Sequence, residues 1–331
     1  MRAIRYRCYG GPEVLHAESV ARPVPPDEGV LVRVRAASAN PLDWHYMRGK
    51  PYIMRSSSGA GAPKDPAFGV DFAGTVVAVG SAVTRFKPGD AVFGGRTGAF
   101  GEYVVVRETR AIVAKPANVS FEQAAAVPVA GVTALQALRD KGGLKPGQKV
   151  LINGASGGVG TFAVQIAKVL GARVTGVCST RNVELVRSLG ADEVIDYTKD
   201  DFTKRTGQYD LIVDMVSSHP LRATLSALKP DGVLVIVGSN DKGNFLGPLK
   251  RSLRAILLAP FVSRRIENLM ADLDPEDLDY LAGLMRAGAL TPVIDRRFTL
   301  EQVPDAMAYL ETGRARGKVV VGIDAGATPG G

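Results

Sequence analysis

The chain has 331 residues, of which 46% are hydrophobic and 22% charged, so it can form about two globular domains with sizeable cores. Its net charge of +8 comes from scattered Lys and Arg residues, which argues against nucleic acid as a partner and favours a basic enzyme with anionic ligands. Cys8 and Cys178 stand far apart and outside any CxxC motif, which excludes a disulfide framework and a cysteine-built zinc site.

The N-terminal segment and the apolar runs predict no membrane segment. The first ten residues, MRAIRYRCYG, lack the apolar stretch of a secretory signal. The longest apolar runs, such as residues 255–262, are too short to span a bilayer. Together with the scarce cysteines, these features predict a cytoplasmic protein.

Short β-strands joined by Gly/Pro turns are predicted for residues 1 to about 118. The clearest predicted strands are residues 30–36, 74–79, 91–93 and 102–106. Turn residues separate them at 23–29, 55–66 and 87–90. This pattern indicates a compact β-rich unit. The long polar loop between Gly49 and Pro66 is predicted to be mobile, either as a binding element or as disorder.

From Ser120 the sequence changes to alternating helices and strands. Ser120 followed by Gln123 predicts an N-capped helix. Further along, predicted apolar strands alternate with helical segments, and they are residues 150–152, 174–178, 193–197, 211–216 and 232–237. This alternation predicts an α/β fold with a doubly wound parallel sheet, in which ligands bind beyond the carboxyl ends of the strands.

The region 243–290 surrounds the apolar run 255–262 with basic residues, namely Lys250, Arg251, Arg254, Arg264 and Arg265. A basic amphipathic surface for a membrane is one interpretation, and a solvated face on a packed helical hairpin is the favoured one. Residues 317–323 form the last predicted strand. The tail, residues 325–331, is predicted to be disordered.

A glycine-rich turn, NGASGGVG at 153–160, joins the strand 150–152 to an amphipathic helix. Its glycines leave room for a pyrophosphate at the helix N-terminus, where free amides and the helix dipole favour an anion. A second strand at 173–178 completes the βαβ context that a dinucleotide fingerprint requires. The turn therefore predicts a nucleotide site. Its predicted contact residues are Gly154, Ser156, Gly157, Gly158, Val159 and Gly160.

Six segments carry a family resemblance and occur in order along the chain. They are ASANPLDWHYMRGKP at 37–51, GVDFAGTVVAVG at 69–80, FKPGDAVFG at 86–94, GVTALQAL at 131–138, NGASGGVG at 153–160 and GRARGKVV at 313–320. With these segments the chain resembles the zinc-free quinone reductase branch of the medium-chain dehydrogenase/reductase superfamily, which includes zeta-crystallin. Residues 178–197 and 291–298 are most similar to the group of the reticulon-interacting mitochondrial reductase and its bacterial relatives.

The resemblance implies a GroES-like β-rich catalytic domain formed by residues 1–119 and 295–331. A Rossmann NADP-binding domain would occupy residues 120–294, with the active site in the cleft between the two domains. Because members of the family are commonly dimers, the resemblance also implies a homodimer as one option.

The resemblance implies no catalytic zinc. Zinc-bearing members of the superfamily bind the metal through a Cys, a His in a GHE-like segment and a second Cys. At the matching positions this chain has Asn40 and Val70, and it has no cysteine near Pro128. A four-cysteine structural lobe is also absent around residues 94–100.

The end of the second strand of the βαβ unit indicates the cofactor. An NAD site usually has a carboxylate there for the ribose 2′-hydroxyl, but this strand ends in Cys178 and is followed by Ser179, Thr180 and Arg181. Ser179 and Arg181 can donate hydrogen bonds to a 2′-phosphate. The sequence therefore predicts NADPH in preference to NADH.

The resemblance adds contacts to NADP(H). Tyr197 matches a tyrosine near the adenosine phosphate, with a strand-end cap as the alternative. Arg316 and Lys318 match contacts to the nicotinamide side or the phosphates, with plain surface charges as the alternative. Thr133 is placed by resemblance alone and can equally be structural. After the two later strands, the predicted contacts are Val216 and Gly238.

Without a metal to polarise the acceptor, hydride transfer suits quinones and α,β-unsaturated carbonyl compounds. Asn40 matches the family's asparagine near the nicotinamide, where it could orient the ring or donate to an oxyanion, although an asparagine before proline is also an ordinary turn residue. Tyr46 is a candidate proton donor. Asp43 and Trp44 are as readily structural. The alternatives are an NADP-dependent alcohol or carbonyl oxidoreductase and a non-catalytic NADPH-binding regulatory or interaction protein.

Overall fold

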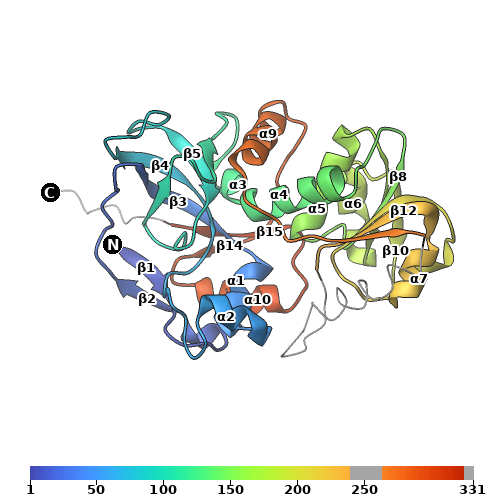
Figure 1. Ribbon diagram of the computed structural model, residues 1–331, viewed down its shortest axis with the longest axis horizontal. Helices are drawn as coiled ribbons and strands as arrows, with labels where there is room; N and C mark the ends of the chain where they lie inside the picture. The colour runs from blue at the N-terminus through green and yellow to red at the C-terminus, as the bar shows by residue number, and fades with distance from the viewer. Residues whose placement is uncertain (239–262, 324–331) are drawn as a thin grey trace. The chain divides into compact units, whose positions relative to one another are not determined.

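The computed structural model describes residues 1–238 and 263–323 (Figure 1). Their contacts divide the chain into two compact units. Unit 1 comprises Met1–Lys50, Met54–Val132 and Leu273–Gly331, and unit 2 comprises Pro51–Ile53 and Thr133–Asp272. The domain boundaries implied by the family resemblance, near residues 120 and 295, stay a prediction.

Unit 1 is built mainly of strands. Within the described residues its larger sheet has seven strands, in the path β14-β15-β3-β4-β5-β7 with β6 pairing β3, while β1 and β2 form a separate pair. The strands are β1 (Arg2–Arg5), β2 (His16–Ser19), β3 (Gly29–Ala39), β4 (Asp71–Val79), β5 (Ala91–Gly95), β6 (Tyr103–Arg107), β7 (Ile112–Ala114), β14 (Ile294–Thr299) and β15 (Lys318–Gly322). The helices are α1 (Pro41–Arg48), α2 (Arg55–Ser58), α3 (Phe121–Ala125), α9 (Pro275–Arg286) and α10 (Val303–Glu311), and α4 (Pro128–Gln136) runs from unit 1 into unit 2.

Strand β3 is the centre of this sheet and pairs antiparallel with β4, β6 and β15. Its Ser38 lies opposite Asp71 on one side and Val320 on the other. Asn40 follows β3 directly and is the N-cap residue of α1, while Lys318 begins β15. The register therefore brings the end of β3 together with the starts of β4 and β15.

Unit 2 contains a parallel sheet. Its described residues form six strands in the order β10-β9-β8-β11-β12-β13, all paired in parallel. The strands are β8 (Lys149–Asn153), β9 (Arg173–Cys178), β10 (Glu193–Asp196), β11 (Tyr209–Asp214), β12 (Leu228–Ile236) and β13 (Arg265–Asn268). The helices are α5 (Gly158–Val169), α6 (Val183–Ser188) and α7 (Leu221–Ser226). The order of the strands reverses direction next to β8, which makes this position the topological switch point of a doubly wound sheet.

Helix α5 follows β8 as the apolar spacing predicts. Ala163, Ile166 and Ala167 are fully buried, and the helix packs against β8 and β9. The predicted N-cap at Ser120 is also confirmed, because its hydroxyl accepts a hydrogen bond from the Gln123 backbone N–H at 3.1 Å. Local sequence signals therefore determine both helix starts.

Two predictions of local structure are wrong in part. The predicted loop 49–66 contains the short helix α2, which Arg55 anchors by donating to the Gly49 carbonyl at 2.9 Å while its guanidinium stacks over Tyr9. The predicted helical hairpin after residue 243 fails at Arg265, which begins strand β13. Lys250, Arg251, Arg254 and the tail 325–331 lie outside the described residues.

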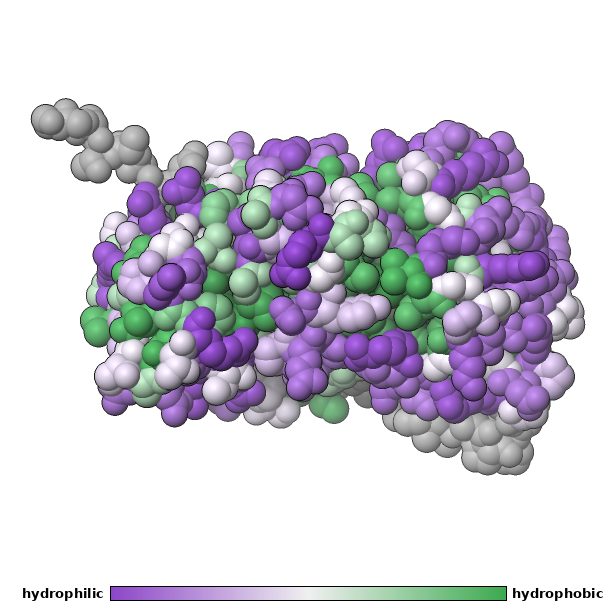
Figure 2. Space-filling model, turned by 90° about the horizontal axis from the view of Figure 1, so that it is seen from above, coloured by the Kyte–Doolittle hydropathy of each residue, from purple (hydrophilic) through white to green (hydrophobic). Residues whose placement is uncertain are grey.

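Hydrophilic residues cover much of the visible face in Figure 2, with apolar residues gathered in separate areas between them. The exposed large apolar side chains are scattered over both units, with Val24 at 86% and Met270 at 90% exposed. None of the helices within residues 1–238 and 263–323 is long and apolar enough to cross a bilayer.

Candidate functional site

Residues predicted to bind a nucleotide follow the carboxyl ends of neighbouring parallel strands in unit 2. The glycine-rich turn follows β8, Ser179 and Arg181 follow β9, and Tyr197 follows β10. Val216 comes shortly after β11 and Gly238 after β12. Because parallel strands end at the same edge of a sheet, the structure brings these predicted contacts to one edge, where doubly wound folds bind ligands.

The glycine-rich turn holds the N-terminus of α5 close to the sheet. Gly154 has a φ of +92°, and the backbone N–H groups of Gly154 and Ala155 both donate to the Val177 carbonyl of β9, at 3.1 and 3.0 Å. A Cβ atom on Gly160 would lie 2.1 Å from the Gly154 carbonyl oxygen, so only glycine allows this approach of helix and turn. The first N–H groups of α5, which have no acceptor within the helix, are thus presented at the turn.

The loops after β11 and β12 are tied to the turn through Asp214. Its carboxylate accepts hydrogen bonds from the Asn153 side chain at 2.8 Å and from the backbone N–H of Ser217 at 2.8 Å. Ser217 has a left-handed φ of +58° and donates its hydroxyl hydrogen to the Gly238 carbonyl at 2.8 Å. Val216 lies beside the turn, because a Cβ on Gly154 would approach its Cγ2 atom to 2.9 Å.

The segment after β9 presents donors at the surface. Ser179 is half-buried and Arg181 exposed, and Tyr197 is 59% exposed with its backbone N–H bound to the Cys178 carbonyl at 3.0 Å. Burial raises the pKa of Cys178 to about 11, so its thiol stays protonated near neutral pH.

One carboxylate stands near these donors and was not considered in the sequence argument. Asp196 ends β10 opposite Cys178, and it accepts a hydrogen bond from the Thr180 hydroxyl at 2.6 Å. That hydrogen bond, with those from Thr198, lowers the pKa of Asp196. The residues at the end of β9 do not indicate this acid, because the parallel register brings it in from the next strand.

Asn182 is a second residue at this strand end that the sequence does not predict as part of the site. It is 5% exposed and donates its side-chain amide to the hydroxyls of Ser156 and Ser179, at 2.9 and 3.3 Å. Its position before α6 resembles an ordinary N-cap, so the sequence offers no signal for this contact.

A cluster of buried polar residues in unit 1, here called the buried polar cluster, contains two of the predicted site residues. Asn40 and Lys318 are 2% and 3% exposed, and the Lys318 ammonium donates to the Asn40 side-chain oxygen at 2.5 Å. The Asn40 amide nitrogen donates to Asp71 at 2.8 Å and to the Ser38 carbonyl at 3.4 Å. Asp71 also lies 3.5 Å from Lys318, and Asp43 accepts a hydrogen bond from the Asn40 backbone N–H at 2.7 Å.

The charges of this cluster constrain one another. Burial, followed by the charge of Asp71, raises the pKa of Asp43 to about 7, although the Asn40 hydrogen bonds oppose the shift. Burial also raises the pKa of Asp71 and lowers that of Lys318, and the attraction between these two opposes both shifts. The buried ammonium is therefore balanced by carboxylates from β4 and α1.

Three further predicted residues lie on α1, on α4 and shortly before β15. Tyr46 is 36% exposed on α1, and Thr133 is buried in α4. Arg316 is exposed, and its backbone N–H donates to Asp295 at 3.0 Å. Their functional roles stay predictions.

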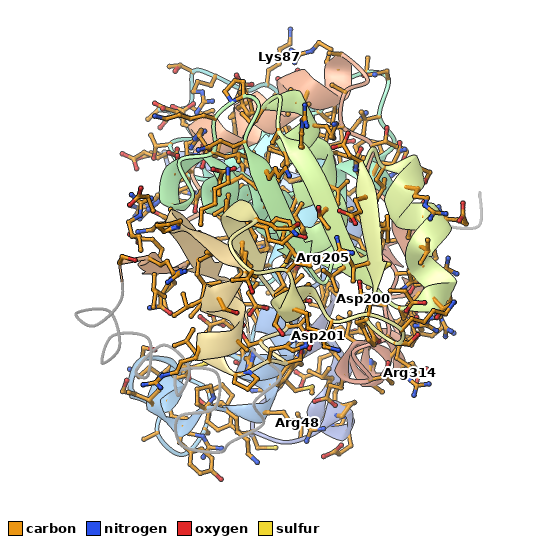
Figure 3. All side chains as sticks on the ribbon, turned by 90° about the vertical axis from the view of Figure 1, so that its right-hand side faces the viewer. Arg48, Lys87, Asp200, Asp201, Arg205 and Arg314 are labelled. Carbon is orange, nitrogen blue, oxygen red and sulfur yellow. The ribbon has the colours of Figure 1, made fainter. Side chains whose placement is uncertain are left out.

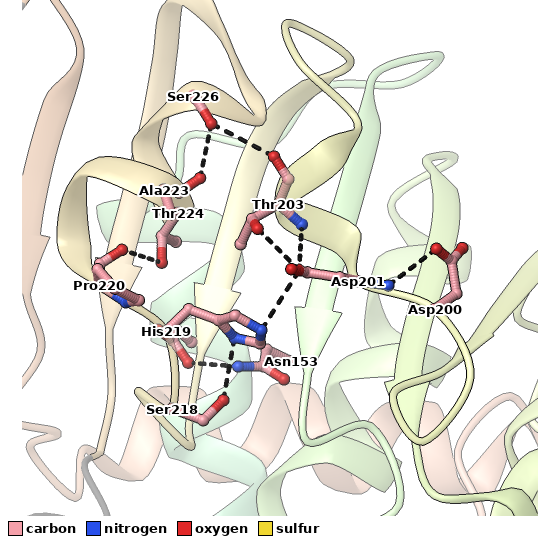
Figure 4. Close-up of polar contacts among 11 residues, drawn as sticks. Asn153, Asp200, Asp201, Thr203, Ser218, His219, Pro220, Ala223, Thr224 and Ser226 are labelled. Atoms are coloured by element: carbon pink, nitrogen blue, oxygen red, sulfur yellow. Dashed lines mark hydrogen bonds and ion pairs between the residues drawn. The ribbon is translucent and has the colours of Figure 1, made fainter.

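Ser218, His219 and Asp201 form an arrangement that resembles a catalytic triad (Figure 4). Ser218 Oγ lies 3.1 Å from His219 Nδ1, and His219 Nε2 lies 3.3 Å from Asp201. In a hydrolase triad the histidine faces the serine with Nε2 and the carboxylate with Nδ1. Here the faces are reversed, and Asp201 caps the backbone N–H of Thr203, so we interpret the arrangement as structural.

Ionic contacts at the surface of unit 2 are also structural. Arg205 binds Asp200 at 3.1 Å and pairs with Glu193, and Figure 3 shows Arg205 and Asp200 near one another. Exposed pairs of this kind contribute little to stability. In the described part of the chain, no three His, Cys, Asp or Glu side chains gather as a metal site requires, and the absence of a catalytic metal stays a prediction.

Comparisons with known proteins match nearly the whole chain. A family model described as an alcohol dehydrogenase GroES-like domain matches residues 26–117, and one described as a zinc-binding dehydrogenase matches residues 189–321. A chloroplast envelope quinone oxidoreductase homolog of Arabidopsis thaliana is 35% identical, covering 97% of this chain and 98% of that protein. A 2-methylene-furan-3-one reductase of Solanum lycopersicum is 36% identical over 97% of this chain and 79% of that protein.

Two further matches bear on the cofactor. A mitochondrial NAD(P)H oxidoreductase of Mus musculus, RTN4IP1, is 36% identical over 95% of this chain and 87% of that protein. The crystal structure of the Escherichia coli quinone oxidoreductase complexed with NADPH matches with a TM-score of 0.83 and 26% identity, covering 97% of this chain and 100% of that chain.

Proposed function

Because the chain belongs to the quinone oxidoreductase family of medium-chain dehydrogenases/reductases, we propose that it reduces quinones or α,β-unsaturated carbonyl compounds with NADPH. It is an oxidoreductase with an NAD(P)-binding Rossmann-like domain and a GroES-like domain. The observation that carries the proposal is this edge of the parallel sheet, where the glycine-rich turn meets Ser179 and Arg181 after β9, a strand that does not itself end in an acid.

The residues of this edge fit the pyrophosphate group of a dinucleotide. Gly154 and Gly160 occupy positions where a Cβ would collide with Val216 or the turn, whereas Gly157 has only a 3.4 Å neighbour to its Cβ position. The turn is therefore tightly packed at Gly154 and Gly160, and it leaves space for a phosphate at Gly157. The hydroxyls of Ser156 and Ser179 add neutral donors that suit phosphate oxygens.

NADP(H), when bound, supplies or accepts the hydride. The turn and the α5 N-terminus would hold the pyrophosphate, Ser179 and Arg181 the 2′-phosphate, and Tyr197 the adenosine end. Val216 and Gly238 would border the cofactor, as would Thr133, Arg316 and Lys318 at its nicotinamide side. The family resemblance and the strand-end positions in unit 2 support the contacts at the sheet edge, whereas those of Thr133, Arg316 and Lys318 rest on the resemblance alone.

Asn40 has little capacity to donate to a substrate oxygen in this arrangement. Its amide nitrogen already donates to Asp71 and to the Ser38 carbonyl, and its oxygen accepts from Lys318. We therefore assign Asn40 the role of orienting the nicotinamide region together with Lys318. This leaves Tyr46 as the proposed proton donor, because its side chain is 36% exposed.

Steady-state oxidation of NADPH tests the proposal with a panel of quinones, enones, enals and simple aldehydes. The expected result is turnover of quinones or enones with a strong preference for NADPH over NADH. Turnover of simple aldehydes alone would favour a carbonyl oxidoreductase instead. Binding of NADPH without consumption of any acceptor would contradict a catalytic role and favour a regulatory protein.

Replacement of the Tyr46 hydroxyl tests its role separately. Tyr46→Phe should lower kcat for enones by about 10²-fold, the low end for a lost general acid, while the Kd of NADPH stays unchanged. Tyr103→Phe in β6 is a matched control and should leave kcat unchanged. An unaltered kcat in Tyr46→Phe would show that the proton comes from solvent or another group.

The substrates, a cytoplasmic location and a homodimer stay proposals for this chain. Relatives with the same family features include chloroplast and mitochondrial proteins. Size-exclusion chromatography with light scattering measures the assembly directly, and a dimer mass is the expected result.

A further inference from the structure

Asn182 departs from the behaviour expected of its position. It is the N-cap residue of α6, where an asparagine side chain normally accepts a hydrogen bond from the first turn of the helix. Here it makes no such bond. Instead its amide group reaches Ser156 in the glycine-rich turn and Ser179 after β9, at 2.9 and 3.3 Å. The side chain is thus used for a contact other than helix capping.

The other end of this side chain has no partner. The Asn182 Oδ1 atom is buried without a hydrogen bond among the described residues, and the residue as a whole is 5% exposed. A buried acceptor without a donor is unfavourable for folding. Capping α6 would have satisfied it, so stability of the fold alone does not explain the observed orientation.

The direction of the two hydrogen bonds determines what the serines can do. A serine hydroxyl has one hydrogen to donate and an oxygen that accepts. In both cases the oxygen accepts from the Asn182 amide, which leaves the hydrogen for another acceptor. Within residues 1–238 and 263–323, no acceptor is recorded for either hydrogen.

Thr180 shows the contrast at the same strand end. Its hydroxyl donates to Asp196 at 2.6 Å, so its hydrogen is already used within the protein. The hydroxyls that Asn182 contacts are therefore the ones available to a ligand with acceptor oxygens. Both stand where the proposed cofactor carries phosphates, since Ser156 lies in the turn and Ser179 follows β9.

We propose that Asn182 is a positioning residue that makes Ser156 and Ser179 act as hydrogen-bond donors to the phosphates of NADPH. Ser156 donates to the pyrophosphate and Ser179 to the 2′-phosphate. Asn182 itself acts through the two serines and not on the phosphates. This inference rests on the proposed function, because it takes NADPH as the ligand.

The test measures the Kd of NADPH and of NADH by isothermal titration calorimetry, with the melting temperature of each variant recorded alongside. Asn182→Ala should weaken NADPH binding by about tenfold, as expected for loss of oriented hydrogen bonds to a charged group. The effect on NADH should be smaller, because NADH lacks the 2′-phosphate that Ser179 contacts. Ser188→Ala, which removes an α6 hydroxyl bound to the Leu185 carbonyl, is the matched control and should change neither Kd.

A double-mutant comparison separates positioning from a structural role. In the Ser156→Ala/Ser179→Ala background, adding Asn182→Ala should cause no further loss of NADPH affinity. A further tenfold loss there would overturn the proposal, because Asn182 would then act independently of the serines. Asn182→Asp should weaken NADPH binding more than Asn182→Ala, because a carboxylate accepts the serine hydrogens and repels the phosphates.

The outcomes also distinguish this inference from the proposed function. If the wild-type chain binds NADPH and Asn182→Ala binds it equally well, the role of Asn182 is refuted and the proposed function stands. If the wild-type chain binds no dinucleotide, both are refuted. If the wild-type chain binds NADPH, Asn182→Ala weakens that binding and no acceptor is turned over, Asn182 is supported as a positioning residue and the proposed reductase is refuted.

Discussion

The buried polar cluster of unit 1 and the sheet edge of unit 2 both place polar residues at strand ends, but they use them in opposite ways. In the buried polar cluster, Asn40, Asp71 and Lys318 satisfy one another's hydrogen bonds. At the sheet edge, the hydroxyls of Ser156 and Ser179 keep their hydrogens available. A polar group that is satisfied internally stabilises the protein, whereas one left with a donor to spare is suited to a ligand.

The largest effect on stability is expected from removing a buried charge in the buried polar cluster. Lys318→Met leaves the Asp71 carboxylate without its cation in a site where both are almost fully buried. Breaking a buried pair in this way should reduce the free energy of unfolding by about 3–5 kcal/mol. Urea denaturation measures the loss.

Lys87→Met is the control for the lysine replacement, because Lys87 is exposed at the edge of the molecule (Figure 3). It should leave the stability unchanged. An equal stability of Lys318→Met and the wild type would show that the buried polar cluster does not depend on its cation.

A smaller loss of stability is expected from a replacement in the glycine-rich turn, because it disturbs backbone packing and removes no charge. In Gly160→Ala, the new methyl group would lie 2.1 Å from the Gly154 carbonyl oxygen, which forces α5 away from the turn. Overpacking of this kind should cost about 1–3 kcal/mol of stability. Thermal denaturation with and without NADPH measures both the loss of stability and the loss of binding.

Gly157→Ala is the matched comparison, because its Cβ would have only a 3.4 Å contact and its φ is −83°. It should retain wild-type stability but lose affinity for NADPH, since the methyl group points into the space proposed for the phosphate. Equal destabilisation by both replacements would contradict this division of roles among the glycines.

The two regions also differ in how pH affects stability, because the buried polar cluster contains buried acids. Burial raises the pKa of Asp43 to about 7, whereas an aspartate in an unfolded chain has a pKa of about 3.9. Between these values the folded chain holds a proton that the unfolded chain has lost. The contribution of Asp43 to stability therefore falls as the pH rises through this window, by at most about 1.4 kcal/mol per pH unit.

Asp43→Asn removes this titration and should flatten the dependence of unfolding free energy on pH between about 4 and 7. Asp71 is present in both proteins, so the difference between the two curves reports Asp43 together with its effect on Asp71. Urea denaturation at a series of pH values provides the curves. Parallel curves would show that Asp43 remains ionised throughout the window.

The two regions also differ in how far the sequence predicts them. The glycine-rich turn can be predicted because Gly154, Gly157 and Gly160 lie close together in the sequence. Glycines at this spacing between a strand and a helix are typical of a phosphate-binding turn. The family resemblance identified Lys318 and Asn40 as separate candidates, but nothing local indicates that residues 278 positions apart bind each other. That contact depends on the antiparallel pairing of β15 with β3.

Asn182, Asp196 and β13 show the same limit in unit 2. Asn182 looks like a helix cap, and only the tertiary fold directs it to Ser156. Asp196 reaches the end of β9 through the parallel register with the neighbouring strand. The basic residues around the apolar run 255–262 predict a helical hairpin that includes Arg265, yet Arg265 pairs with Val233 as part of β13. Strand pairing is a non-local property that periodicity does not reveal.

The most direct test of the account is the ratio of the Kd values for NADH and NADPH in the wild type and in Arg181→Ala. We expect the wild type to prefer NADPH and Arg181→Ala to bind NADPH about tenfold more weakly, with little change for NADH, because only NADPH carries the 2′-phosphate. An equal loss of affinity for both dinucleotides would contradict the assignment of this sheet edge to NADPH.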